Sequence, residues 1–481
     1  MKVKRFRGKI FYPVMYEGDS AALGEVTVTT NRQKTVPVFE KSSVHCEEMR
    51  KGLGCLLDGT HPNSIASVYT VARREVFFYP KNNKGLVFCT RNKRRAPIAL
   101  GEIRFLLFET HVAFFQMDFE LEDMSLEETM NTTYYLCEVK DAANHFEYEN
   151  QRYDPVTKQK TGEPVSFSLK EWFLRCASYL PGCRSFEDRP LEDLTAKPIL
   201  YGYYLLDEKP ENFERLGINI AQNYKLSYKG AESGDHILQT FENSAWCVSY
   251  NGAINVSHQV EDPVTNQFFE TTFAHKWASE YLFLFINTLH QKYAVLKYLA
   301  ELNDLSCAQY DFALMRKLLV KGEVMQEKCA VLKKRSFFNL PSHVEHVNRV
   351  YGFFQWSFDI PGYLASLNAG VETSVSVCKS YVTRTKEVED LEKSLRTTRN
   401  EMYIALITAS ITCLTFFNSF YGTLQHLLHG RLDQIDLSSL IVAATFFTTI
   451  ATVAVNLTKQ LDEMSDLRDQ IRKLKSQTVT L

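Results

Sequence analysis

Two long uncharged stretches near the C-terminus form the strongest hydrophobic pattern in the chain. Residues 402–424 and 437–458 contain no Asp, Glu, Lys or Arg. As helices rising 1.5 Å per residue, each would be roughly 33 Å long, enough to cross the hydrocarbon core of a bilayer. They predict two transmembrane helices joined by an outer loop, residues 425–436. Two core helices of a soluble protein are the alternative interpretation.

Fixed positive charges flank this pair of spans and are scarce between them. The loop has only Arg431. The flanking cations are Lys393, Arg396 and Arg399 before the first span, and Lys459, Arg468, Arg472 and Lys473 after the second. Loops rich in Lys and Arg stay on the cytosolic side of a membrane. The pattern predicts a multi-pass protein of the cell inner membrane with both termini in the cytosol.

An apolar stripe at heptad spacing leads into the first span. It consists of Val371, Val375, Cys378 and Val382 and, after an irregularity, Val388, Leu391 and Leu395. We expect a long stalk helix within residues 341–401 that starts or kinks at Pro361–Gly362. Leu467, Ile471 and Leu474 continue the spacing in residues 459–481, which predicts that this segment packs as a cytosolic helix against the stalk.

The first part of the chain shows the alternation of apolar and polar positions that is typical of β-strands. Strands are expected within 103–121, where two meet at Glu109–Thr110, and at 133–139, 199–205 and 247–257, with a helix at 169–179. Residues 271–340 read as two helices, 271–305 and 310–334. The predicted fold class is an α/β cytosolic domain, residues 1–270, with this helical part, a stalk and a C-terminal two-helix transmembrane hairpin.

Composition and charge narrow the functional classes. The 481 residues include 55 Lys and Arg against 57 Asp and Glu, for a net charge of −2. A near-neutral chain has no gross electrostatic attraction to long nucleic acid. The mean hydropathy of −0.22 looks soluble, because the two apolar spans occupy only about a tenth of the residues. The N-terminus carries cations but no apolar run that would serve as a signal peptide.

Motifs for catalysis and metal binding are missing from the sequence. It has no glycine-rich phosphate loop, no H-E-x-x-H and no G-x-S-x-G. The 11 cysteines never occur as C-x-x-C, so we expect reduced structural thiols. His343 and His346 would sit on adjoining helix positions, but no third ligand is indicated. We expect no enzyme activity, no metal site and no certain cofactor.

Hydroxyl groups follow one face of the first span. Thr408, Thr412, Thr415 and Ser419 recur at spacings of four, three and four, and Gly422 continues the stripe. Small polar residues of this kind either let helices pack closely in a membrane or line a water-filled pore. Two spans cannot enclose a pore, so conduction would require a ring of subunits.

The segment Leu414–Gly422, which ends the first of two C-terminal spans after a long predicted helix, resembles the CorA family of cation channels. The resemblance implies a homopentameric funnel with a pore-lining first span and a peripheral second span. Thr415 falls where the family has a pore-facing threonine. The implied pore lining is Thr408, Thr412, Thr415, Asn418, Ser419 and Gly422.

The sequence departs from this family at the ion filter. The family signature is Tyr-Gly-Met-Asn, whose Asn ring holds a hydrated magnesium ion, whereas the residues here are Tyr421, Gly422, Thr423 and Leu424. A carboxamide can hydrogen-bond the first-shell water of Mg²⁺, and a leucine cannot. The departure argues against selectivity for Mg²⁺ and leaves it open whether Mg²⁺ is a permeant or a regulatory ion.

Two basic clusters in the first domain are candidates for binding a small anionic ligand. Arg73 and Arg74 precede the strand-like residues 76–79, and Arg91, Arg94 and Arg95 follow them, with Tyr79 available to stack on a base. Basic hairpin ends are more often simply solvated. A nucleotide site at these residues is therefore a hypothesis beside that plainer interpretation.

Three functions remain open. The first is transport of Mg²⁺ or Co²⁺, which the hairpin favours and the altered filter opposes. The second is a gated effector: some CorA-like proteins accompany type III CRISPR systems and are thought to permeabilise the inner membrane in antiviral defence. Their signal is a nucleotide second messenger such as a conjugate of S-adenosylmethionine and AMP. The third is a membrane-anchored binding module without a pore.

We favour the second function. A ligand bound in the cytosolic domain, or between subunits, would bias the stalk between two packings, and the first spans would then widen. Asp433 and Asp436 of the loop would draw cations to the outer mouth. The expected partners are other copies of the chain, the lipid bilayer and one small nucleotide, with no long nucleic acid.

Overall fold

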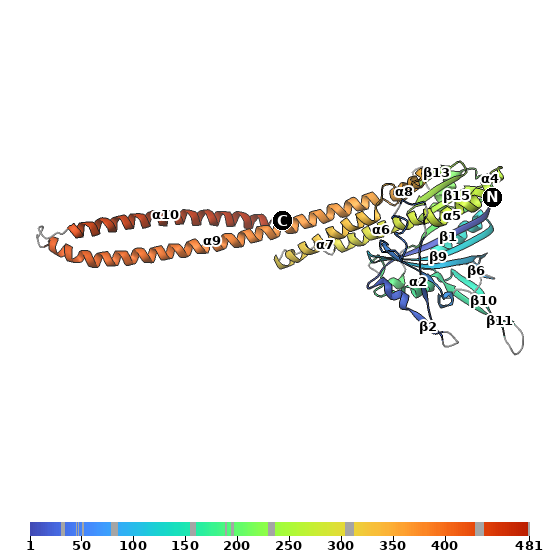
Figure 1. Ribbon diagram of the computed structural model, residues 1–481, viewed down its shortest axis with the longest axis horizontal. Coiled ribbons are helices and arrows are strands. Elements are labelled where there is room, and N and C mark those ends of the chain that lie inside the picture. The colour runs from blue at the N-terminus through green and yellow to red at the C-terminus, as the bar shows by residue number, and fades with distance from the viewer. Residues whose placement is uncertain are drawn as a thin grey trace. The chain divides into compact units, whose positions relative to one another are not determined.

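The computed structural model describes residues 1–29, 34–44, 46, 48–50, 52–77, 85–153, 160–187, 190–193, 197–228, 236–303, 312–428 and 437–479. The chain forms two compact units (Figure 1). The first combines Met1–Asp304 with Met325–Gly370, and the second combines Leu305–Val324 with Val371–Leu481. Most of the helical part expected at residues 271–340 belongs to the same unit as the sheet, and residues 305–324 belong to the second unit.

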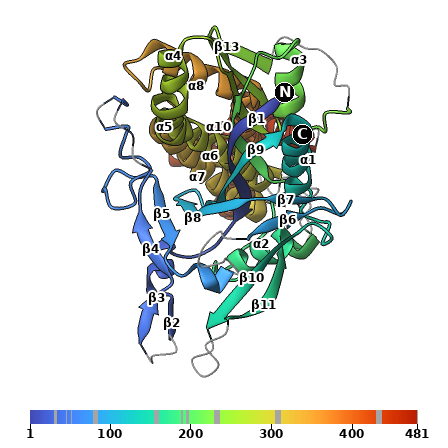
Figure 2. The ribbon, with the colours of Figure 1, turned by 90° about the vertical axis from the view of Figure 1, so that its right-hand side faces the viewer.

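A nine-stranded mixed sheet forms the centre of the first unit (Figure 2). Its strand order is β13-β14-β15-β12-β1-β9-β8-β5-β4, and among these described strands only β12 and β15 pair in parallel. The strands are β1 (Lys2–Met15), β4 (Phe39–Ser42), β5 (Ala66–Val71), β8 (Ala99–Phe108), β9 (Val112–Ser125), β12 (Ile199–Leu206), β13 (Ile237–Phe241), β14 (Ser244–Ser249) and β15 (Gly252–His258). The strands predicted within 103–121 and at 199–205 are confirmed as β8, β9 and β12.

Two smaller sheets belong to the same unit. One has the order β11-β10-β6-β7, and the other pairs β2 with β3. Their strands are β2 (Thr27–Thr29), β3 (Thr35–Pro37), β6 (Val87–Cys89), β7 (Arg95–Pro97), β10 (His145–Tyr153) and β11 (Lys160–Ser168). In the antiparallel pairing of β6 with β10, Cys89 lies directly opposite His145.

Alternation along β1 gives the large sheet two buried faces. Phe6, Ile10 and Tyr12 belong to one hydrophobic core, whereas Phe11 belongs to the other. The helices of the first core are α1 (Leu126–Cys137), α2 (Leu169–Ala177) and α3 (Phe213–Ala221). Those of the second are α4 (Pro263–Phe268), α5 (Ala274–Lys276), α6 (Leu282–Asn303) and α8 (Glu345–Ser357). Helices therefore cover both faces of the sheet, as the α/β fold class predicts.

One strand prediction in this unit is wrong, and another is confirmed only in part. Residues 133–139 lie largely in α1, because Ser125 and Glu128 form a capping box that starts a helix at Leu126. The aromatic and β-branched residues of this stretch, which favoured a strand, instead pack along a largely buried helix. The stretch 247–257 is a hairpin of β14 and β15 rather than one strand.

Three long helices supply the second unit: α7 (Phe312–Ser336), α9 (Ile360–Leu428) and α10 (Leu437–Val479). The first residues of α9 and the last of α7 belong to the first unit. Helix α9 starts beside Pro361, as predicted, because a proline in the first turn removes no intrahelical hydrogen bond. Its 69 residues make the expected stalk and first span one continuous helix.

The heptad stripe of α9 is confirmed as a contact surface. Leu318 of α7 packs against Cys378 of α9. Further along, Lys475 of α10 donates to Glu392 of α9 at 2.8 Å, and Ile471 is buried. The predicted packing of the C-terminal helix against the stalk is therefore confirmed.

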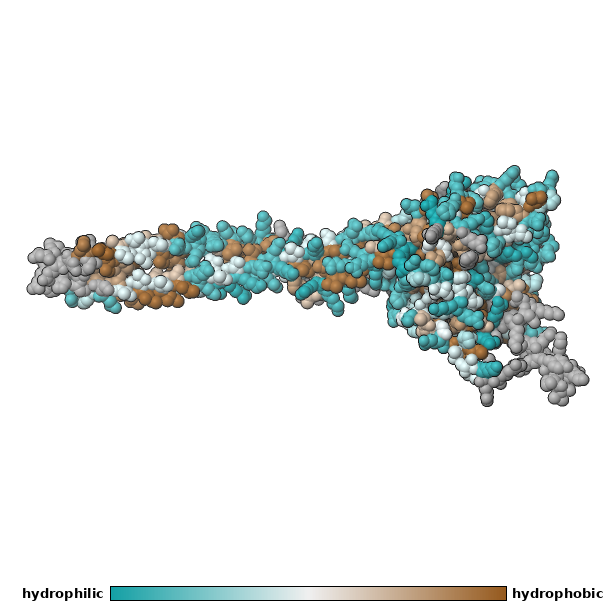
Figure 3. Space-filling view, viewed as in Figure 1, coloured by the Kyte–Doolittle hydropathy of each residue, from teal (hydrophilic) through white to brown (hydrophobic). Residues whose placement is uncertain are grey.

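Apolar side chains remain uncovered along α9 and α10, toward the end of α9 and the start of α10 (Figure 3). Leu414 and Phe417 of α9 are both 67% exposed, and Phe447 of α10 is 68% exposed. The two helices touch through Phe416 and Phe446, whose ring centroids lie 3.8 Å apart. Both helices are long and apolar enough to cross a membrane, by length and composition.

A lysine lies buried in α6 among aromatic rings. Lys292 is 4% exposed, and its Nζ lies 4.2 Å from the ring centroid of Tyr250 and 4.8 Å from that of Phe358. Burial lowers the pKa of this ammonium group from 10.5 to about 8. Between these two values the unfolded chain binds the proton and the folded chain does not, so Lys292 makes stability rise with pH in that window.

Replacing Lys292 with methionine should therefore stabilise the protein most where the lysine is charged. We expect the thermal midpoint of Lys292→Met to exceed that of the wild type at about pH 7, and the difference to shrink by about pH 9.5. Thermal unfolding of the full chain in detergent measures both. The exposed Lys379 of α9 provides a control, because Lys379→Met should show no such trend. A difference for Lys292→Met that stays constant with pH would contradict the assignment.

Candidate functional site

The hydroxyl groups of the first span are bonded to their own helix. The Oγ1 atoms of Thr408, Thr412 and Thr415 each donate to the carbonyl oxygen four residues earlier, at 2.8 Å. Such a bond satisfies a hydroxyl without water or a second helix. The stripe is therefore compatible with lipid, with a helix contact and with a pore.

The residues of the predicted pore lining differ in how far they are buried. Thr412 is half-buried on the side of α9 where Phe416 stacks on α10. Thr408, Thr415 and Asn418 are exposed. The surface of α9 that this chain leaves available to line a pore thus contains these three residues and not Thr412.

The second span carries hydroxyls of the same kind, which sequence reasoning did not weigh. Thr445, Thr448, Thr449 and Thr452 of α10 also donate to carbonyl oxygens four residues earlier. Hydroxyl content alone therefore does not distinguish a pore-lining helix from a peripheral one in this protein.

The residues of the predicted filter, 421–424, are part of helix α9. Tyr421 is 63% exposed. Ser419, Gly422, Thr423 and Leu424 are described as helical backbone only, and Asp433 and Asp436 of the predicted outer mouth lie outside the described residues.

The second basic cluster is an ion-paired turn between β6 and β7, which we call the arginine turn (Arg91–Arg95). The acidic partners of Arg91, Arg94 and Arg95 are Asp141 at 3.6 Å, Glu127 at 3.5 Å and Glu147 at 2.9 Å. A phosphate bound here would compete with these carboxylates, so the turn is a weaker anion site than its composition predicts.

The first basic cluster lies on another element. Arg74 begins a 3₁₀ turn, Arg74–Phe77, where a strand was expected, and Arg73 precedes it. Tyr79 lies outside the described residues. None of the described contacts joins this turn to the arginine turn, so the predicted nucleotide site is not assembled from the residues that were named for it.

The two neighbouring histidines are not brought together on one helix. His343 precedes α8, whereas His346 lies in its first turn with its ring against Phe241, at a centroid distance of 5.7 Å.

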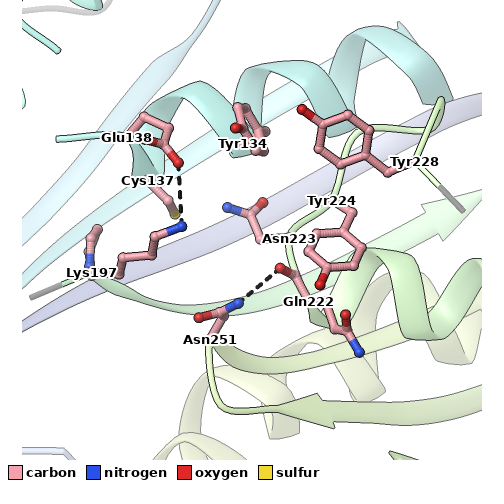
Figure 4. Close-up of a pocket in the computed structure, with 10 residues that line it drawn as sticks. Tyr134, Cys137, Glu138, Lys197, Gln222, Asn223, Tyr224, Tyr228 and Asn251 are labelled. Carbon is pink, nitrogen blue, oxygen red and sulfur yellow. Dashed lines mark hydrogen bonds and ion pairs between the residues drawn. The ribbon is translucent and has the colours of Figure 1, made fainter. Parts of the chain in front are cut away.

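A polar pocket in the first unit offers a better ligand site (Figure 4). It lies where the end of α1, the residues leading into β12 and the residues after α3 meet, and its volume is about 140 Å³. We call it the tyrosine pocket. Its lining is Tyr134, Cys137, Glu138, Lys197, Pro198, Gln222, Asn223, Tyr224, Tyr228 and Asn251.

Asn223 lies among these side chains (Figure 4). It follows α3 with a φ of 54°, and the helix ends with bonds from Tyr224 N to Asn219 O and from Asn223 N to Ile220 O. This is a Schellman end, in which Asn tolerates the left-handed conformation. Its Nδ2 donates to Thr133 O at 3.3 Å. Its buried Oδ1 has no partner among the described residues, which leaves an acceptor for a ligand N–H.

Three tyrosines give the pocket an aromatic wall. The ring of Tyr228 meets those of Tyr134 and Tyr224 edge to face, at centroid distances of 6.1 and 6.0 Å. Burial and the nearby Glu138 raise the pKa of Tyr134 to about 12, so its hydroxyl stays protonated and can donate. Lys197 pairs with Glu138 at 3.4 Å.

Lys225 connects this pocket to the arginine turn. Its Nζ lies 4.6 Å from the ring centroid of Tyr134, and it donates to the Tyr135 hydroxyl at 2.7 Å. The same hydroxyl accepts a bond from Asn92 Nδ2 at 2.6 Å. Because Asn92 belongs to the arginine turn, the Tyr135 hydroxyl links the predicted basic cluster to Lys225 beside the tyrosine pocket.

The lining can hold a small planar polar group. Tyrosine faces stack on heterocycles, and the amides of Gln222, Asn223 and Asn251 offer donors and acceptors for a ring edge. The volume is smaller than the roughly 300–1,000 Å³ of sites for drug-sized ligands. One ring system would fit, and the rest of a larger ligand would lie outside.

Larger hollows in the first unit suit an anion less well. One of about 830 Å³ has Glu242, Glu261 and Asp262 in its lining. Another of about 290 Å³ lies over β1 and β9, where the buried Lys9 is already paired with Asp118. The carboxylates in both disfavour a phosphate.

The tyrosine pocket could not be predicted because the secondary structure of residues 133–139 was predicted wrongly. Residues 133–139 were expected to form a strand, in which Tyr134 and Cys137 point to opposite faces. In a helix, residues three and four apart share a face, so Tyr134, Cys137 and Glu138 line one side of the pocket. The capping box at the start of α1 is the signal that could have found them.

Two substitutions of Asn223 separate its backbone role from its amide role. Both Asn223→Gly and Asn223→Ala remove the amide from the pocket, but only glycine adopts a positive φ without strain. We expect the alanine variant to be less stable than the glycine variant by about 1 kcal/mol. Thermal unfolding of the two variants side by side measures the difference, and equal stability would contradict the left-handed assignment.

Comparison with known proteins identifies no family. No protein-family model matches the chain, and no curated protein or solved structure matches it. The functional conclusion therefore depends on the residues and geometry described above.

Proposed function

We propose that this chain is a subunit of an oligomeric membrane channel that opens when a small nucleotide-derived ligand binds its sheet-containing unit. The observation that carries the proposal is the uncovered surface of α9. Apolar Leu414 and Phe417 are exposed there together with Thr408, Thr415 and Asn418. Apolar groups require lipid or a neighbouring subunit, and polar groups among them favour a wet interior.

A ring of copies is needed, because two spans cannot enclose a pore. Five copies follow from the resemblance to the CorA family and are part of the proposal. The exposed face with Thr415 and Asn418 would turn toward the pore axis, and the apolar remainder would face lipid or the next subunit.

Helix α9 supplies the coupling between ligand and pore. Its first residues belong to the first unit and the remainder to the second, and it is unbroken over 69 residues. A ligand that favours one packing of the first unit's helices over another would bias the position of this helix. The spans would then move between a closed and an open ring.

The tyrosine pocket is the proposed ligand site. An adenine ring would stack on Tyr134 or Tyr228, and its exocyclic amine would donate to Asn223 Oδ1, which has no partner among the described residues. Lys225 and the arginine turn would then meet a phosphate outside the pocket. In its most specific form the proposal is a CRISPR-associated antiviral effector that answers a conjugate of S-adenosylmethionine and AMP at the inner membrane.

A membrane-anchored binding module without a pore is the second candidate. It is favoured by the threonine hydroxyls, which bond to their own helices on both α9 and α10. In that case the ligand would bind and no ion would pass.

Two matched threonine substitutions test the pore. We expect Thr415→Val to lower ligand-triggered ion flux from liposomes by up to about tenfold, because it removes a hydroxyl from the proposed lining and one hydrogen bond contributes about 0.5–1.5 kcal/mol. Thr448→Val removes an equivalent hydroxyl from α10 and should leave flux unchanged. Equal effects of the two variants would contradict the assignment of α9 as the lining helix.

The same flux assay distinguishes the candidate functions by which ions pass and by whether a nucleotide is needed. We expect the reconstituted wild type to pass cations after addition of AMP, S-adenosylmethionine or their conjugate. Passage of Mg²⁺ or Co²⁺ alone, without a nucleotide, would favour the transporter. No flux under any of these conditions would leave the membrane-anchored module.

Stacking in the tyrosine pocket predicts a loss of affinity on truncation. We expect Tyr134→Ala to weaken binding of an adenine-containing ligand by about 10–100-fold, since one base–aromatic stack is worth about 1–3 kcal/mol. Calorimetric titration of the full chain measures it. Tyr148→Ala, a half-buried tyrosine of β10 outside the pocket, is the matched control, and a similar loss in that variant would argue against the pocket.

A further inference from the structure

A thiol, an imidazole and a carboxylate meet on the four-stranded sheet, outside the tyrosine pocket and next to Arg95 of the arginine turn. They belong to Cys89, His145 and Glu147, and their ligand atoms all lie within 4.8 Å of one another. Figure 2 shows β6 and β10, the strands that carry them, in this sheet. No short sequence motif marks the trio, because it is assembled across two strands.

Strand pairing fixes the three residues relative to one another. His145 of β10 lies directly opposite Cys89 of β6. Glu147 follows two residues later on β10 and so points to the same face as His145. Side chains on paired strands are held more rigidly than side chains on loops, as a binding site requires.

The imidazole of His145 points its Nε2 toward Glu147 and its Nδ1 toward the backbone. Its Nδ1 lies 3.0 Å from Ala143 O, which is only an acceptor, so Nδ1 carries a proton. Its Nε2 lies 2.8 Å from Glu147 Oε1. When the ring is neutral with its proton on Nδ1, Nε2 and Glu147 Oε1 are both acceptors. Two acceptors this close require a proton or a cation beside them. A carbonyl that fixes Nδ1–H is the usual outer contact of a metal-bound histidine.

The carboxylate is also held from its far side. Arg95 Nη2 binds Glu147 Oε2 at 2.9 Å, which leaves Oε1 toward His145. Cys89 is only 7% exposed, whereas the side chains of His145 and Glu147 are 28% and 36% exposed. The trio is therefore anchored on one side and open to solvent on the other.

We propose that Cys89, His145 and Glu147 bind a divalent metal ion of the Zn²⁺ class, with a water molecule as fourth ligand. Zinc takes sulfur at about 2.3 Å, nitrogen at about 2.0–2.1 Å and oxygen at about 2.0–2.2 Å in tetrahedral sites, and small side-chain movements bring the three atoms to these distances. A thiolate selects zinc over Mg²⁺ and Ca²⁺, which prefer oxygen ligands. The Cys89 proton leaves to solvent when the metal binds. The ion would cross-link β6 to β10.

Cobalt substitution tests the site on the full chain in detergent. After treatment with EDTA and desalting, we expect one Co²⁺ per chain, with a thiolate-to-cobalt charge-transfer band in the near ultraviolet that Zn²⁺ displaces. Cys89→Ser should abolish this band. His145→Ala should weaken binding by more than about 100-fold, since even outer contacts of a metal site are worth 10–100-fold. Cys55, whose thiol donates to Gly52 O, provides the matched control. The Cys55→Ser variant should keep the band.

Two results would overturn the proposal: a wild type without the band, and a Cys89→Ser variant that retains it. If the variant fails to fold, zinc-edge X-ray absorption of the wild type decides instead. One sulfur neighbour is the expected result there, and a shell of nitrogen and oxygen alone would overturn the site. Neither measurement depends on ion flux, so the metal site and the channel can fail separately.

Discussion

The apolar side chains that α9 and α10 leave uncovered impose the constraint on which the rest of the molecule depends. Leu414, Phe417 and Phe447 are about two-thirds exposed, and exposure of such a surface to water is unfavourable at roughly 25 cal/mol per Å². A bilayer removes this penalty. It also demands that every backbone group be satisfied within the span, which a helix achieves. The hairpin therefore suits lipid or further copies of itself, not water.

The polar groups of α9 and α10 differ in how unfavourable they are in contact with lipid. A threonine hydroxyl that bonds to its own backbone, such as that of Thr415, is inexpensive to place in lipid. The carboxamide of Asn418 has two donors and an acceptor, more than one backbone carbonyl can satisfy. Asn418 is thus a stronger indication of a wet surface than the hydroxyl stripe. In the first unit, Asn223 Oδ1 has the corresponding importance as an open acceptor beside aromatic rings.

Features with a local period could be predicted from the sequence, and features assembled from distant segments could not. The heptad stripe, the start of α9 at Pro361 and the two long apolar helices all depend on neighbouring residues. Residues 133–139 misled because their aromatic and β-branched side chains favour a strand, while a capping box and burial against the sheet make them helical. The tyrosine pocket arises only when α1 packs beside the segments that flank β12 and α3, and the trio around Cys89 and His145 arises only when β6 pairs with β10.

A gated pore is tested most directly by current through a planar bilayer that contains the purified full chain. Stepwise currents are predicted when the conjugate of S-adenosylmethionine and AMP is added on the side of the first unit, and they should vanish on washout. A bilayer that stays silent under voltage, although the protein binds the conjugate in solution, would contradict the pore and leave a membrane-anchored binding protein.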